Sequence, residues 1–265
     1  MLILLSPAKN LNFDPAPLEI SPTKPSLARE TAVLAEHTRG LTRANIKKLM
    51  GLSDQLTDLN FERFQAFKTK GRITGAISAA FAFNGDVYQG LDARSLDEES
   101  LDFAQKHVRI LSGLYGVLRP LDAIQPYRLE MGTKLANSRG RDLYDFWGDL
   151  ISSELNKALR GHADKTIVNL ASNEYFSAVD QDALGRDVIT PAFKEEKDGK
   201  LKSLMFYAKR ARGMMARWAI DNRAETVDDL KAFNLEGYSF RPDGSSPTHW
   251  LFTRPQPTPK NQRAA

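Results

Sequence analysis

The segment from Leu111 to Gly132, LSGLYGVLRPLDAIQPYRLEMG, concentrates side chains that could bind an anion. Arg119 and Arg128 offer positive charge, and Glu130 adds a hydrogen-bonding carboxylate. The two prolines bias the residues before them away from helical geometry, so we expect a rigid loop of turns and extended pieces that aims these side chains. The alternative is a structural loop in which the arginines pair with acids of the same segment.

A basic run from Ala208 to Trp218, AKRARGMMARW, is a second place where an anion could bind. A helix here would bury an apolar stripe through Met214 and Met215, with few acids nearby to neutralise its exposed side. Such a side suits a phosphate backbone, and the alternative is a solvated face whose aliphatic stems cover the core. The basic residues of the run are Lys209, Arg210, Arg212 and Arg217.

Lys9 follows an apolar strand candidate and a proline turn, a position from which a side chain can reach the end of a sheet. Acids close to it would suggest an enzyme pocket with perturbed pKa values, and the pocket residues that we expect in that case are Tyr127, Glu130 and Asp145. Core packing and turn formation remain the alternatives. No residue is assigned a catalytic role.

The composition is that of a globular protein, with 265 residues of which 42% are hydrophobic and 26% charged. Without cysteine the chain cannot form disulfides, thiolate zinc sites or thiol-peroxidase centres. The four histidines lie far apart and no carboxylate run has ligand spacing, so we expect neither a metal nor another cofactor. The net charge of +4 permits nucleic-acid binding without requiring it.

The apolar run at the N-terminus, LILL, is too short for a signal peptide or a membrane span, so we expect a cytoplasmic protein that does not contact the membrane. The hydrophobic pattern predicts a single mixed α/β domain over residues 1–254, in which helices surround a mixed sheet, and a disordered tail over 255–265. The expected helices cover residues 26–37, 42–50, 97–111, 149–159 and 209–223, and the expected strands cover 2–5, 166–172, 187–193, 200–209, 238–240 and 249–254.

Eight segments, in this order along the chain, resemble segments of the YaaA family of bacterial peroxide-stress proteins. They are ILLSPAK, FNGDVYQGL, LSGLYGVLRPLD, PYRLEMG, LYDFWGD, NLASNEYF, FYAKRARGMMARW and FNLEGYSF. The resemblance implies a cytoplasmic protein that protects against hydrogen peroxide and has a compact α/β fold peculiar to the family. It also implies binding of double-stranded or junction DNA in a positively charged cleft, a helix-hairpin-helix element and a link to recombination repair proteins. It supplies no catalytic reaction.

The segment NIKKLMGLSDQL fits the helix-hairpin-helix element that the resemblance implies. Gly51 would let the hairpin backbone approach a phosphate, while Arg43, Lys47 and Lys48 on the preceding helix add charge. The match is imperfect because Ser53 replaces the usual second glycine of the hairpin. The alternative is an ordinary turn between two helices with a glycine cap.

Three functions therefore remain open. The first is a DNA-binding protein of the peroxide-stress response with little sequence preference. The residues expected to contact its phosphates are Lys9, Arg43, Lys47, Lys48, Gly51, Arg119, Arg128, Lys209, Arg210 and Arg212. The second is an enzyme that acts on a nucleotide, a base or a DNA end in the same cleft. The third is a factor that limits free iron during peroxide stress.

Overall fold

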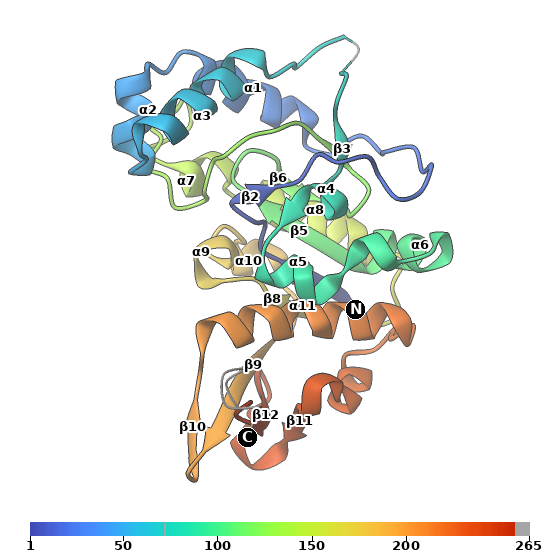
Figure 1. The fold of residues 1–265 in the computed structure, drawn as a ribbon. Coiled ribbons are helices and arrows are strands. Elements are labelled where there is room, and N and C mark those ends of the chain that lie inside the picture. Colours follow the sequence, from blue (N-terminus) through green and yellow to red (C-terminus); the bar gives the residue numbers. More distant parts are fainter. Residues whose placement is uncertain (72, 258–265) are drawn as a thin grey trace.

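A largely parallel eight-stranded sheet organises the computed structural model, which describes residues 1–71 and 73–257 (Figure 1). The strand order is β11-β12-β9-β8-β1-β5-β6, and β10 pairs with β9. The parallel strands are β1 (Leu2–Leu5), β5 (Val108–Ser112), β8 (Ile167–Leu170), β9 (Val188–Lys197) and β12 (His249–Pro255). The antiparallel strands are β6 (Gly116–Leu118), β10 (Lys200–Lys202) and β11 (Ser239–Arg241). This arrangement confirms the expected mixed α/β class.

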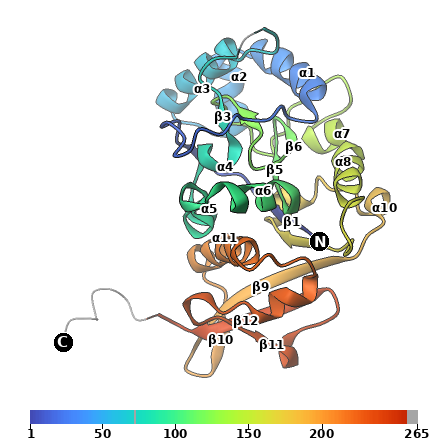
Figure 2. The same ribbon diagram turned by 90° about the vertical axis from the view of Figure 1, so that its right-hand side faces the viewer.

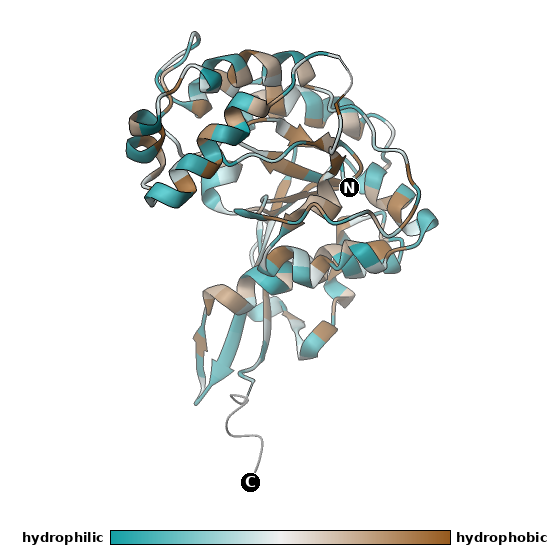
Figure 3. Ribbon diagram, turned by 45° about the horizontal axis from the view of Figure 1, so that its top comes forward, coloured by the Kyte–Doolittle hydropathy of each residue, from teal (hydrophilic) through white to brown (hydrophobic). Residues whose placement is uncertain are grey.

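The central strand β1 is apolar throughout because it pairs with parallel neighbours on both sides and is covered on both faces. All four of its residues are fully buried, and the interior strands stand out as hydrophobic in Figure 3, whereas the helices around them carry many polar residues. Two small ribbons lie outside this sheet, formed by β2 (Asn10–Leu11) with β4 (Phe83–Asn84) and by β3 (Ile77–Ser78) with β7 (Ala123–Ile124).

Helices cover the sheet and form one end of the molecule. In Figures 1 and 2, α1, α2 and α3 lie at the end farthest from β10, β11 and β12, and α11 lies between these last strands and the rest of the domain. The α-helices are α1 (Ala28–Arg39), α2 (Arg43–Met50), α3 (Asp54–Ala66), α4 (Ala79–Ala82), α5 (Asp86–Leu91), α6 (Glu98–His107), α7 (Leu143–Trp147), α8 (Leu150–Leu159), α9 (Asn173–Phe176), α10 (Gln181–Leu184) and α11 (Met205–Asp221). Short 3-10 turns occur at η1 (Ala93–Ser95), η2 (Val227–Ala232), η3 (Leu235–Gly237) and η4 (Pro242–Gly244).

The helix α11 is enclosed on nearly every side, unlike the one-sided helix that its sequence suggests. Its buried residues include the expected Met214 and Met215 and also Gly213 and Ala216, which lie on the side predicted to be exposed. Gly213 faces α5, where a Cβ atom would come within 1.8 Å of the carbonyl oxygen of Val87. The helix thus packs between α5 and the strands around β9 (Figure 2), and among its exposed residues are Met205, Phe206 and Lys209.

In two predicted elements, the last residues adopt a different secondary structure from the one expected. The helix expected over 97–111 ends at His107, and Val108 begins β5 directly, because Val108 pairs with Ile3 of the central strand. Asp97 caps this helix, because its carboxylate accepts a hydrogen bond from the backbone N–H of Ser100. The strand expected over 200–209 is only three residues long, and α11 takes up the chain from Met205.

The segment from Leu111 to Gly132 contributes two strands and much of the core instead of a surface loop. Every residue from Leu111 to Leu118 is buried, and the chain forms the end of β5, then β6 and β7. The hydroxyl of Ser112 lies 2.6 Å from that of Tyr127, so two buried polar groups of the segment satisfy each other. Its lack of a single period follows from this succession of short strands and tight turns.

The C-terminal strand β12 is connected to α11 through a series of ion pairs. Arg254 on β12 and Glu195 on β9 are 4% and 0% exposed, with 3.4 Å between Nε and Oε1. Arg254 also pairs with Glu236 at 2.8 Å, and the second oxygen of Glu236 pairs with Arg210 of α11 at 2.9 Å. Glu236 thus connects the last strand to α11. This strand includes Pro255, and residues 258–265 of the expected tail lie outside the described residues.

Candidate functional site

A pocket of about 810 Å³ opens at the carboxyl ends of β1 and β8. The next two parallel strands along the chain, β5 and β8, pair with opposite edges of β1, which makes this a topological switch point of the sheet. Loops diverge at such a point and leave a crevice where α/β proteins commonly bind ligands. The pocket is lined by Ser6, Pro7, Ala8, Lys9, Asn10, Asn84, Gly85, Asp86, Val87, Tyr88, Glu130, Ser172, Asn173, Glu174, Tyr175, Ser203, Met205, Ala208, Lys209 and Arg212.

The loops that follow β1 and β8 are fastened to each other at the base of the pocket. The backbone N–H of Ser172 donates a hydrogen bond to the Ser6 hydroxyl at 2.8 Å, and the Tyr88 hydroxyl on α5 donates to the Ser6 carbonyl at 3.0 Å. Each serine is the first or second residue after a buried strand. Neither serine was among the predicted site residues, although their position after the strands LILL and IVNL is a signal that could have identified them.

Lys9 and Arg128 both pair with Glu130. The Lys9 ammonium lies 2.7 Å from one carboxylate oxygen, and the Arg128 guanidinium lies 3.0 Å from the other. Burial raises the pKa of Glu130, but the hydrogen bonds from the two cations outweigh it and hold the pKa below its usual value. Arg128 thus pairs with the acid of its own segment, as in the structural alternative, and it stands behind Glu130, which lines the pocket.

Buried tyrosines support the pocket from below. Tyr88 and Tyr175 line it, and Tyr127 lies near both without reaching the lining. Burial raises the pKa of all three hydroxyls above their ordinary value, so each stays protonated at neutral pH. They can donate hydrogen bonds and position neighbours, but they are poor general bases.

The helix α11 contributes two cations to the pocket wall, Lys209 and Arg212. Lys209 is exposed, and Arg212 is half-buried, which lowers the pKa of its guanidinium. Within residues 1–71 and 73–257, neither side chain forms an ion pair or a hydrogen bond. The positive charge of this wall is therefore left for a ligand or for solvent.

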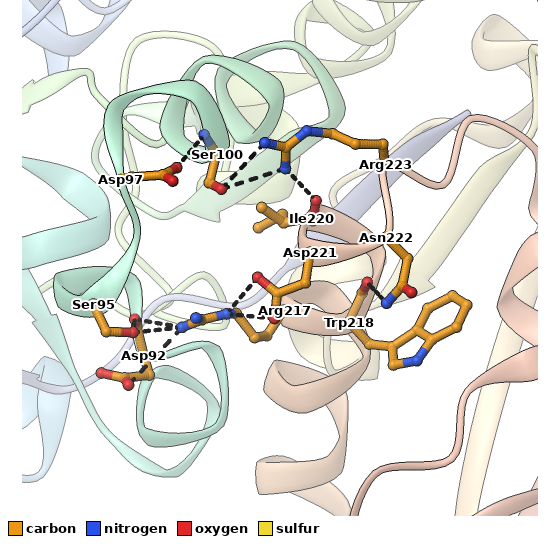
Figure 4. Close-up of polar contacts among 10 residues, drawn as sticks. All are labelled: Asp92, Ser95, Asp97, Ser100, Arg217, Trp218, Ile220, Asp221, Asn222 and Arg223. Carbon is orange, nitrogen blue, oxygen red and sulfur yellow. Dashed lines mark hydrogen bonds and ion pairs between the residues drawn. The ribbon is translucent and has the colours of Figure 1, made fainter.

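The other two arginines of α11 are engaged within the protein. Arg210 pairs with Glu236 at 2.9 Å. Arg217 forms two 2.9 Å hydrogen bonds with the Asp221 carboxylate and donates to the Ser95 hydroxyl at 2.6 Å (Figure 4). Their charges stabilise the packing of α11 against its neighbours.

The hairpin of α2 and α3 forms as its cap signals predict. Thr42 caps α2 with a capping box, and Gly51 ends it at φ 59°, a left-handed conformation that favours glycine. Arg43 pairs with Asp58 of α3 at 2.6 Å. Lys47 pairs with Asp54 at the same distance, whereas Lys48 is exposed and forms no ion pair within the described residues.

The residues predicted to bind DNA thus fall into separate groups. Lys9, Lys209 and Arg212 share the pocket, but α2 lies at another end of the molecule from α11 (Figures 1 and 2). Arg119 lies outside the pocket and pairs at 2.8 Å with Asp122, whose side chain is 1% exposed. Asp145 also lies outside the pocket lining, where its carboxylate accepts a hydrogen bond from the backbone N–H of Arg141.

Among residues 1–71 and 73–257, no three His, Cys, Asp or Glu side chains gather in a way that could hold a metal ion. No helix in the same part of the chain combines the length and apolar character needed to cross a membrane.

The full length of the chain is similar to known bacterial proteins. The UPF0246 protein of Maricaulis maris is 57% identical over 265 residues, which is all of both chains. That of Phenylobacterium zucineum is 56% identical over 98% of this chain and 97% of its own, and that of Shewanella amazonensis is 49% identical over 96% and 99%. A family model described as peroxide stress protein YaaA matches residues 1–244. The chain belongs to this YaaA family.

Five of the eight segments that resemble the YaaA family line the pocket at the ends of β1 and β8. They supply Lys9, Tyr88, Glu130, Tyr175 and Arg212, among other lining residues. The remaining three segments pack the YaaA fold: the Trp147 indole donates a hydrogen bond to the Gly113 carbonyl, and Glu236 bridges α11 and β12. The resemblance therefore concentrates on this pocket more than on the hairpin, which lies in none of the eight segments.

Proposed function

We propose that this protein binds duplex or junction DNA with little sequence preference and thereby protects DNA during peroxide stress. Membership of the peroxide stress protein YaaA family supports the physiological part of the proposal. The observation that carries the DNA-binding part is the pair of cations on α11, Lys209 and Arg212, which have no acidic partner within the described residues. Phosphate groups of a nucleic-acid backbone are the counterions that such a wall suits.

The hairpin between α2 and α3 would supply a second phosphate contact, as a helix-hairpin-helix element. A Cβ atom built on Gly51 has no neighbour within 4 Å, so nothing in the protein blocks a phosphate there. The first turn of α3 also offers backbone N–H groups that have no helical partner. Lys48 adds an exposed charge on the adjoining helix.

A gel-shift titration across salt concentrations tests the proposal. About four to six phosphate contacts would give a slope of log affinity against log salt near −4 to −5, at roughly −0.9 per contact. Random-sequence and defined duplexes should bind alike. Absence of binding at low salt, or an affinity that does not change with salt, would contradict the proposal.

The pocket supports a second candidate, an enzyme that acts on a nucleotide, a base or a DNA end. The specific observation is the position of Lys9 and Glu130 at the carboxyl edge of the sheet, where α/β enzymes place their reacting groups. Mass spectrometry of oxidised nucleotides and nicked duplexes incubated with the protein tests this candidate. Products that form with the parent and not with Glu130→Gln would support it, and unchanged substrates with both would count against it.

A further inference from the structure

The pocket lining combines side chains of opposite charge. Lys209 and Arg212 are its cations on α11, and Asp86 and Glu174 contribute carboxylates. A ligand that satisfies both kinds of side chain carries negative charge as well as N–H or O–H donors. An extended duplex backbone offers phosphates but little that would answer the carboxylates.

Arg212 is the strongest sign of a bound anion. Its guanidinium is half-buried in the wall, and removing a charge from water without a partner is unfavourable. Arg210 and Arg217 on the same helix are both matched by carboxylates. The contrast indicates that the partner of Arg212 is not among residues 1–71 and 73–257 and is a bound anion.

The rim of the pocket adds an apolar surface. Met205 lines the pocket and is 74% exposed, and Phe206 beside it in the chain is 52% exposed. Large side chains exposed together at the edge of a polar pocket suit a flat apolar group such as a nucleobase. The volume of about 810 Å³ is within the range of small-molecule sites.

We infer that this pocket binds one nucleotide, with its phosphate on Arg212 and Lys209, its donor groups toward Asp86 and Glu174, and its base toward Met205. The nucleotide nature of the ligand rests on the proposed DNA-binding function. The same chemistry is available from a free mononucleotide and from a single unpaired nucleotide within a strand. The experiment below separates these two sources.

Isothermal titration calorimetry compares a nucleoside 5′-monophosphate with its nucleoside as probes. We expect the monophosphate to bind at least tenfold more tightly than the nucleoside. We expect Arg212→Gln to lower the affinity for the monophosphate at least tenfold. Lys209→Gln should also weaken monophosphate binding. Because Lys209 is exposed, this loss of affinity would not be a consequence of misfolding. Arg217→Gln removes the same charge from the same helix outside the pocket and should keep affinity within about twofold of the parent.

A duplex with one unpaired 2-aminopurine identifies the source. If the 2-aminopurine fluorescence changes on binding to the parent but not to Arg212→Gln, the ligand is an unpaired nucleotide within a strand. If the free monophosphate binds and the fluorescence of the duplex does not change, the ligand is a free nucleotide. The inference is overturned if neither probe responds, if nucleoside and monophosphate bind equally, or if both pocket variants bind like the parent. Failure of the proposed function has a different result, because no duplex would then bind at low salt whatever the monophosphate does.

Discussion

Gly213 of α11 and Val87 of α5 are in direct backbone contact. A Cβ atom on Gly213 would lie 1.8 Å from the Val87 carbonyl oxygen, and one on Gly90 would lie 2.2 Å from the Arg210 carbonyl oxygen. The two glycines let the helices cross at a separation that no other residue permits. This crossing holds Tyr88 and Arg212 on neighbouring walls of the same pocket.

Replacing Gly213 with alanine should therefore destabilise the protein. The added methyl group meets rigid backbone, so we expect the free energy of unfolding to fall by about 3 kcal/mol, near the upper end for overpacking. Urea denaturation measures the change. Gly161→Ala is the matched control, because a Cβ there has no neighbour within 4 Å and its stability should stay near that of the parent. Equal stability of the two variants would show that the helices can separate without cost.

Arg119→Ala should affect stability more than DNA binding. The change leaves the buried Asp122 carboxylate with hydrogen bonds from Thr23 and from the backbone of residue 119 only. We expect a loss of about 2 kcal/mol in the free energy of unfolding and an unchanged salt slope. Lys209→Ala should give the opposite result. Its melting temperature should match that of the parent, and its slope of log affinity against log salt should be smaller by roughly the value of one phosphate contact. Weaker DNA binding by a fully stable Arg119→Ala would place a phosphate at Arg119.

Two substitutions at Gly51 separate backbone strain from phosphate approach. Gly51→Val should lower both stability and DNA affinity, since a β-branched residue is strained at φ 59°, at a cost of roughly 1 to 2 kcal/mol. Gly51→Asn tolerates the left-handed conformation and should keep stability near the parent while its side chain still hinders a phosphate. Gel shifts and thermal melting on both variants provide the test. Parental DNA affinity in Gly51→Asn would make the hairpin an ordinary turn.

Stability should fall in mild acid because of His162. Burial, followed by the nearby His107, lowers the pKa of His162 from 6.5 to about 4. The folded protein thus keeps a neutral ring while the unfolded chain takes up a proton, so this stability is complete above pH 6.5 and is lost as the pH falls toward 4.

When the pH is lowered from 7.5 to 5.5, the free energy of unfolding should fall by about 0.5 to 1 kcal/mol less in His162→Gln than in the parent. This figure is reduced for solvent screening of the half-buried ring. Urea unfolding at the two pH values measures this difference. His37→Gln changes an exposed histidine on α1 and controls for the loss of a ring. Identical pH dependence in His162→Gln and the parent would contradict the prediction.

Local signals in the sequence were sufficient for several elements. The run Leu2–Leu5 is a buried strand, Thr42 caps α2, and the helix expected from 149 to 159 begins only one residue later, because each depends on neighbouring residues. The end of α6 depends instead on pairing between Val108 and Ile3, which are distant in the chain. No periodicity within residues 97–111 contains that information.

The sequence identified several residues of the pocket but not how they are arranged in space. Lys9 lies at the end of the sheet, as its place after a strand and a proline turn suggests. Its position in the same pocket as Arg212 depends on the strand order and on the crossing of α5 with α11, neither of which has a local signature in the sequence. Arg217 looks like Arg212 in sequence, and only the folded structure shows that Asp221 engages one and leaves the other available.

The pocket takes Lys9 from the first loop of the chain and Arg212 from a helix near its end. During synthesis, the pocket is therefore complete only after α11 has left the ribosome. A product truncated before that helix lacks the wall that carries Arg212. A ligand that contacts both walls would therefore stabilise the folded state by linking β1 to α11. Binding would slow amide hydrogen exchange in β1 and α11 together, although the two lie at opposite ends of the sequence.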